Sequence, residues 1–221
     1  MNAALRVHVI TSCTGRKVAL APGDTVPAER LYCGQHHIRL MRGVDYLRAT
    51  GATVDVWIVS AGHGLVHGAE LLAPYEKTFQ GRRRVERHAM ASQLGIPRAI
   101  RAVLASRADL TIVLLGDDYL HACQLAGPVK QGAPTLVFAS ASASLAMSAI
   151  PGLHVVALGV EHTRQFAAGL VALKGEVGGR LLAALADGAV SIDDVLTENP
   201  LPSLAVFSGR SEATDATATL F

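Results

Sequence analysis

The chain has 221 residues, of which half are apolar and 5% aromatic, and its formal net charge is +2. This length and composition favour one α/β domain, and the small charge does not indicate a globally basic nucleic-acid binder. The three cysteines are widely spaced and form no CxxC pair, which indicates a reducing compartment. No apolar run approaches the about 18 residues of a membrane span, and residues 1–9 lack the pattern of a signal peptide. We therefore expect a cytoplasmic protein without membrane contact.

Apolar runs and helical patterns alternate along the chain. The runs predict strands at 5–10, 54–60, 110–115, 135–140 and 155–158. Helical patterns lie at 27–50, 82–106, 119–125 and 161–185. We expect Pro97 to break the second of these, and glycines to loosen the last at Gly169, Gly175, Gly178 and Gly179. Residues 61–80 show no clean periodicity and predict a long loop, which is often functional.

This alternation predicts an α/β fold in three layers, α/β/α, with a central, mainly parallel sheet of four to five strands. One domain is expected to span residues 1–198, followed by a mobile C-terminal tail at 199–221. Ligands of such sheets bind beyond the carboxyl ends of the strands. The segments that follow the first four strands are small and polar, and we expect them to converge on one edge: 12–17, 60–76, 116–119 and 140–144.

The turn after the first strand combines small polar residues with two cations. Ser12 and Cys13 precede Gly15, whose turn frees backbone N–H groups, and Arg16 and Lys17 follow. Such a cluster suits an anion such as a phosphate. It lacks the glycine spacing of a Walker loop and the Cys-to-Arg spacing of a tyrosine phosphatase. The alternative is a solvated turn with a buried cysteine.

The segment after the second strand places two glycines around a histidine. Gly62 and Gly64 permit close backbone approach to a ligand, and His63 can donate a proton or a hydrogen bond. Ser60 ends the strand and joins the predicted site. The third glycine of a dinucleotide motif is missing, so a nucleotide cofactor is not indicated. A purely structural turn is the alternative.

Further along the chain, aromatic and acidic residues extend the predicted site. Tyr75 can stack on a planar base, and Glu76 can act as a general base. The alternative for this pair is a packed tyrosine beside a capping carboxylate. Asp117 can bind a sugar hydroxyl, with an ordinary helix N-cap as its alternative. Substrate contacts are also expected from Tyr32, Gln35 and Tyr119.

Two further clusters invite specific interpretations. Cys33 and His37 are spaced i, i+4 on one helix face, but they fall short of the three or four ligands that zinc sites require, so no metal is predicted. A basic stretch could track the phosphates of DNA or RNA, although a solvated helix face is the commoner explanation. Its residues are Arg82, Arg83, Arg84 and Arg87, with Arg98 and Arg101 beyond them.

Four segments carry a family resemblance: Ser12-Cys13-Thr14-Gly15-Arg16-Lys17, Leu31-Tyr32-Cys33-Gly34, residues 57–65, and Pro74-Tyr75-Glu76. Together they resemble a largely uncharacterised bacterial and archaeal family that is similar to the core domain of archaeosine synthase. That domain is in turn similar to the uracil-DNA glycosylase-like α/β/α fold. The resemblance covers roughly residues 5–145 and implies a pocket for a nucleobase or nucleotide at the strand ends.

Two departures from those relatives limit what the resemblance implies. No Asp-Pro-Tyr motif for activating water follows the first strand, so the catalytic assignments of uracil-DNA glycosylases are not carried over. The family's usual Tyr-Asp appears here as Tyr75-Glu76, which keeps a carboxylate on a longer side chain.

These observations predict an N-glycosidase or base-exchange enzyme that acts on a nucleobase, modified or not, in a nucleotide or nucleic acid. No cofactor is predicted. Arg16 and Lys17 are expected to hold phosphate, and Tyr32 and Tyr75 to clamp the base or sugar. The catalytic candidates are Glu76 or Asp117, to stabilise an oxocarbenium-like state or activate water, and His63, to bond the leaving base.

Two alternatives of other classes stay open. One is a non-catalytic nucleotide or nucleic-acid binding module that works with a partner enzyme. The other is a thiol enzyme that uses Cys13, with its pKa lowered by the neighbouring Arg16 and Lys17.

Overall fold

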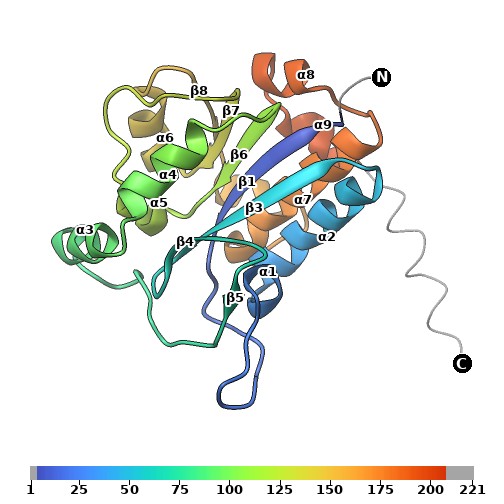
Figure 1. Cartoon of the computed structure of the whole chain (residues 1–221). Helices are drawn as coiled ribbons and strands as arrows, with labels where there is room; N and C mark the ends of the chain where they lie inside the picture. Colours follow the sequence, from blue (N-terminus) through green and yellow to red (C-terminus); the bar gives the residue numbers. More distant parts are fainter. Residues whose placement is uncertain (1–3, 208–221) are drawn as a thin grey trace, which may run out of the picture.

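The computed structural model describes residues 4–207, and within them a six-stranded sheet is covered by helices on both faces (Figure 1). The strands are β1 (Arg6–Ser12), β2 (Val26–Pro27), β3 (Thr53–Ser60), β4 (Gly64–His67), β5 (Leu71–Leu72), β6 (Leu110–Leu114), β7 (Thr135–Ala139) and β8 (Leu153–Ala157). The main sheet has the order β4-β3-β1-β6-β7-β8, and β2 pairs with β5 in a separate ribbon.

Five strands of the main sheet run parallel, and only β4 is antiparallel to its neighbour β3. Every residue of β6 and β7 is buried, because apolar β-branched residues fill the centre of a sheet covered on both faces. The three-layer α/β/α prediction is confirmed. The sheet has one strand more than the expected four to five, because β4 lies inside the segment predicted to be a loop.

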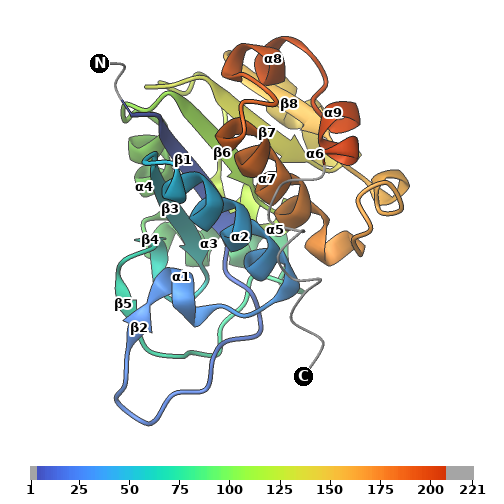
Figure 2. The same ribbon diagram turned by 90° about the vertical axis from the view of Figure 1, so that its right-hand side faces the viewer.

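The helices are α1 (Ala28–Leu31), α2 (Gln35–Ala49), α3 (Arg84–Gln93), α4 (Ile96–Leu104), α5 (Asp117–Cys123), α6 (Ala141–Ser148), α7 (Leu170–Ala186), α8 (Ile192–Thr197) and α9 (Leu201–Val206), with a short 3-10 turn, η1, at Val160–His162. Figures 1 and 2 show α2, α7 and α9 on one face of the sheet and α3 to α6 on the other. None of the helices in residues 4–207 is long and apolar enough to cross a membrane.

Helices α2 and α7 pack closely, and glycines make this approach feasible. A Cβ atom at Gly175 would collide with the carbonyl oxygen of His36, and one at Gly179 would lie 2.5 Å from the carbonyl oxygen of Arg39. The expectation that these glycines loosen the last helix is therefore wrong. They let α7 lie directly on α2, at the cost of a lower intrinsic helix propensity.

Several predicted helices and loops differ from the structure for local reasons. The helix expected at 27–50 is interrupted, because the Gly34 N–H bonds the Thr14 hydroxyl and separates α1 from α2. The helix at 82–106 breaks at Gly95, which has a positive φ of 67°, so Pro97 falls in the first turn of α4 instead. The final helical pattern starts at Leu170, later than predicted.

The predicted C-terminal tail contains a packed helix. Helix α9 covers Leu201–Val206 and contacts α7, and Leu201 and Leu204 are buried. This part of the tail is anchored by apolar burial, contrary to the expectation of mobility from residue 199. The remainder of the predicted tail, residues 208–221, lies outside the described residues.

Candidate functional site

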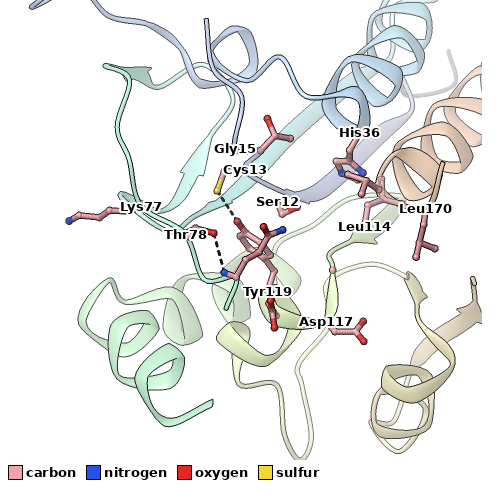
Figure 3. A pocket seen from close by; sticks show the side chains of 15 residues that line it. Ser12, Cys13, Gly15, His36, Lys77, Thr78, Leu114, Asp117, Tyr119 and Leu170 are labelled. Atoms are coloured by element: carbon pink, nitrogen blue, oxygen red, sulfur yellow. Dashed lines mark hydrogen bonds between the residues drawn. The ribbon is translucent and has the colours of Figure 1, made fainter. Parts of the chain in front are cut away.

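A cavity of about 410 Å³ opens at the carboxyl ends of β1 and β6. The chain runs from β1 outward to β3 and then returns past β1 to β6, so these two strands flank the point where the strand order reverses. Ligands of doubly wound sheets bind at such a point. The cavity is lined by Ser12, Cys13, Thr14, Gly15, His36, Lys77, Thr78, Gln80, Leu114, Gly116, Asp117, Asp118, Tyr119, Leu170 and Val171 (Figure 3).

The turn after β1 forms one wall of the cavity and leaves its backbone available. Within residues 4–207, no hydrogen bond uses the amides of Thr14, Gly15 or Arg16. The Thr14 hydroxyl fixes the turn, because it donates to the carbonyl of Arg16 and accepts from Gly34 N–H. Three consecutive free amides are suited to an anion.

The thiol of Cys13 meets the helix after β6. Its sulfur lies 3.1 Å from the hydroxyl oxygen of Tyr119, as Figure 3 shows, and both side chains are buried. Burial and the nearby thiol raise the pKa of Tyr119, so this hydroxyl stays protonated. The Tyr119 ring also packs edge-on against Phe79. The cavity therefore holds a fixed, neutral phenol.

The predicted cations, Arg16 and Lys17, directly follow the cavity-lining Gly15 in the chain. Arg16 is exposed, and the Lys17 ammonium lies 4.4 Å from the centre of the Tyr75 ring, a cation–π distance. Neither side chain lines the cavity. Lys77 does line it, but in Figure 3 its amino group extends away from Cys13 and Tyr119.

The two carboxylates of the cavity have different partners. Asp117 accepts hydrogen bonds from the hydroxyls of Ser140, at 2.7 Å, and Ser142, at 3.4 Å. Asp118 forms an ion pair with the buried guanidinium of Arg87, at 2.6 Å. Asp118 is thus paired with a structural cation, whereas the hydrogen bonds of Asp117 come from neutral hydroxyls.

His36 reaches the cavity from the start of α2. Its Nε2 lies 2.8 Å from the Thr11 hydroxyl, inside the core. Burial, with smaller contributions from the neighbouring His37 and Lys174, lowers the pKa of His36 to about 4. The imidazole is therefore neutral at physiological pH and serves as a polar contact rather than a charge.

The segment after β3 forms a saturated network beside the cavity. The buried Ser60 hydroxyl accepts hydrogen bonds from the amides of Gly62 and His63 and donates to the Tyr75 hydroxyl over 2.6 Å. That hydroxyl lies 3.0 Å from the Tyr32 hydroxyl. Burial raises the pKa of Tyr32 to about 12 and also raises the pKa of Tyr75. None of these five residues lines the cavity.

The structure divides the predicted site residues into two groups. Of the three catalytic candidates, only Asp117 lines the cavity, because Glu76 is exposed and His63 is an exposed ring packed edge-on against Tyr75. Gln35 is also exposed and outside the cavity, and Gly64 packs against the carbonyl of Leu94. The predicted substrate contacts that line the cavity are Ser12, Cys13, Gly15 and Tyr119.

Some cavity residues were not predicted from the sequence. Leu170 and Val171 are 60% and 87% exposed, and they come from α7, far along the chain from the motifs. A helical sequence pattern predicts that apolar residues such as these are buried, and it does not predict that they line a cavity. His36, next to the His37 that was considered for zinc, carried no prediction of ligand contact. Thr78 and Gln80 belong to the long segment whose length alone suggested function.

The basic stretch is only partly on the surface. Arg82, Arg83 and Arg84 are exposed, and Arg83 forms an ion pair with Glu86. Arg87 is buried, pairs with Asp118 and donates to the carbonyl of Arg82, so its predicted role in contacting phosphate is wrong. Within residues 4–207, no group of three or more His, Cys, Asp or Glu side chains is placed to hold a metal ion.

The fold and cavity define a doubly wound α/β protein with a polar ligand site at the reversal of its strand order. The chain belongs to the family of unknown function DUF6884, whose sequence profile matches residues 9–136. This region contains the end of β1, the turn after it, β6 and α5, which together supply most of the cavity. No curated protein matches the chain.

Proposed function

We propose that the cavity binds a nucleobase of a nucleotide or nucleic acid and that the protein hydrolyses the N-glycosidic bond between base and sugar. The observation that supports this most is the pairing of a carboxylate with free amides. Figure 3 shows Tyr119 between Gly15 and Asp117. A cavity of about 410 Å³ lies in the usual range of small-molecule sites. Its parts match the phosphate, base and sugar of one nucleotide.

Each wall of the cavity then has a role. The free amides of residues 14–16, with the adjoining Arg16 and Lys17 side chains, hold a phosphate. The base lies against the Tyr119 ring and Leu170. A base removed from its stack is commonly bound by such aromatic and apolar contacts.

The chemistry requires a carboxylate near the sugar and a donor near the base. Breaking the bond places positive charge on the sugar ring and negative charge on the departing base. Asp117, held by Ser140, stabilises the sugar cation and accepts a proton from the attacking water. The Tyr119 hydroxyl stays protonated and donates a hydrogen bond to the leaving base.

Three further points belong to the proposal. A relationship to the archaeosine synthase core domain and the uracil-DNA glycosylase-like fold is part of this proposal, and the three-layer arrangement around a mainly parallel sheet is compatible with it. The exposed Arg82, Arg83 and Arg84 are available to a DNA or RNA backbone. A cytoplasmic location fits the free thiols of Cys13, Cys33 and Cys123.

The test is release of free base, quantified by mass spectrometry, from nucleosides, nucleotides, and DNA and RNA with ordinary and modified bases. We expect the protein to release base from at least one class, and Asp117→Asn to reduce the rate by about 100-fold or more. Glu76→Gln is the matched control, because this exposed carboxylate lies outside the cavity. Its rate should stay within about threefold of the wild-type rate.

Two results would overturn the proposal. Absence of base release from every class contradicts it directly, and so does an Asp117→Asn rate equal to that of the wild type. Tight ligand binding without release would favour the non-catalytic binding module instead.

A further inference from the structure

Lys174 places a partly buried amino group beside the cavity. It lies on α7 one helical turn after Leu170 and Val171, which both line the cavity. Its Nζ donates a hydrogen bond to the carbonyl of Leu115 over 2.5 Å. The buried Leu115 directly follows β6 and immediately precedes Gly116 and Asp117, which also line the cavity. The amino group is therefore at the junction of the α7 wall and the β6 end.

The same amino group interacts electrostatically with two residues that line the cavity, Asp117 and His36. Burial lowers the pKa of Lys174 to about 8, although Asp117 raises it, and Lys174 in turn lowers the pKa of His36. With this pKa, roughly a quarter of the amine is neutral at pH 7.5, against about one in a thousand for an ordinary lysine. A desolvated lysine of this kind is a nucleophile toward carbonyl carbon.

We propose that the cavity supports a second activity, in which the amine of Lys174 condenses with the aldehyde left at C1′ of the sugar and thereby cleaves a nucleic-acid strand. This inference rests on the proposed function, because loss of a base from a nucleic acid produces that aldehyde. It also specifies the substrate class, since only a nucleotide within a strand carries a 3′-phosphate linked to the next nucleotide.

The reaction balances without an oxidant or reductant. The Lys174 nitrogen forms a bond to C1′, and the carbonyl oxygen leaves as water, which gives an imine. Asp117 then accepts the C2′ proton, and the electron pair of that C–H bond forms a C2′–C3′ double bond. The C3′–O bond breaks, and its electron pair leaves with the phosphate of the next nucleotide. Water hydrolyses the imine and returns the free amine.

The experiment uses a DNA oligonucleotide that already contains an abasic site, with sodium borohydride added during incubation. Borohydride reduces the imine to a stable amine, so a covalent protein–DNA product appears on a denaturing gel and its lysine is identified by peptide mass mapping. We expect the wild-type product to map to Lys174 and its yield to rise between pH 7 and pH 9. Because the abasic site is made beforehand, this result does not depend on base release by the protein.

Three variants test whether the amine of Lys174 reacts with the sugar or only has a structural role. Lys174→Met removes the amine, and Lys174→Arg keeps the positive charge and a donor for the Leu115 carbonyl; both should reduce the trapped product at least 20-fold. Lys130→Met changes an exposed lysine outside the cavity and should leave the yield unchanged. Thermal unfolding shows whether each variant is folded. If Lys174→Met is misfolded, the yield of trapped product from Lys174→Arg alone tests the proposal.

The proposal is overturned if the wild-type protein gives no trapped product. It is equally overturned if the product maps to Lys17, Lys77 or the N-terminus, or if it persists in a folded Lys174→Arg variant. Base release with no trapping would leave the proposed function intact and remove only this second activity.

Discussion

The segments at the ends of β1 and β3 contain similar residues but differ in their hydrogen bonding. Both strands end in a serine followed by small residues and glycine. After β1, the amides of residues 14–16 have no partner within residues 4–207, and Ser12 lines the cavity. After β3, Ser60 bonds two amides and Tyr75, so its hydrogen-bonding capacity is used internally. The two segments therefore differ in whether their polar groups already have hydrogen-bond partners, and not in the types of residue that they contain. The segment after β1 lines the cavity with free amides, whereas the segment after β3 is held together by its own hydrogen bonds.

The largest effect on stability is expected at Ser60. Its hydroxyl is fully buried, and Ser60→Ala would leave two amides and the Tyr75 hydroxyl without this partner. We expect the free energy of unfolding to fall by about 3 kcal/mol, measured by denaturant titration. The matched change Ser12→Ala should alter it by less than about 0.5 kcal/mol while weakening ligand binding. Equal losses from the two changes would contradict the distinction between the strand ends.

Glycine substitutions test the same difference between the segments after β1 and β3. A Cβ atom at Gly62 would lie 2.5 Å from the Tyr75 ring, whereas one at Gly15 meets nothing within 4 Å. Gly62→Ala should therefore lower the free energy of unfolding by about 2 kcal/mol through overpacking, and Gly15→Ala should leave it nearly unchanged. Thermal unfolding monitored by circular dichroism measures both. A Gly62→Ala variant as stable as the wild type would show that the ring moves without cost.

The smallest expected effect is a pH dependence at the cavity wall. Burial lowers the pKa of His36 to about 4, so between pH 6.5 and pH 4 the unfolded chain binds a proton that the folded chain does not. Stability is thus complete above pH 6.5 and falls with pH. From pH 7.5 to pH 5.5 the His36 contribution to the loss is roughly 1.3 kcal/mol.

Histidine variants isolate this contribution from the other titrating groups. His36→Gln should flatten the dependence of unfolding free energy on pH, because the neutral amide does not titrate. The same change at His63, an exposed ring at the β3 end, should leave the slope unchanged. A wild-type slope retained in His36→Gln would assign the pH dependence to other groups, among them His8 and His37, whose pKa burial also lowers.

The parts of the fold predicted from the sequence are those governed by local pattern. β1, β3, β6 and β7 are predominantly apolar and mostly buried, and they match the predicted strands within two residues at each end. The polar segments after β1 and β6 were placed correctly at one edge because the geometry of a parallel sheet requires it.

What the sequence did not predict depends on contacts between distant residues. β4 exists because it pairs with β3, and Arg87 is buried because Asp118 lies opposite it, 31 positions further along the chain. The exposure of Glu76 follows from Tyr75 turning inward to Ser60. None of these pairings leaves a periodic signal in the residues themselves.

The two walls of the cavity come from separate parts of the chain. The region shared with the DUF6884 family ends at residue 136, yet α7 begins at Leu170 and completes the cavity with Leu170 and Val171. The region matched by the family profile thus supplies one wall of the cavity, and a later segment supplies the other. A change confined to α7 would reshape that second wall without altering any residue of the matched region.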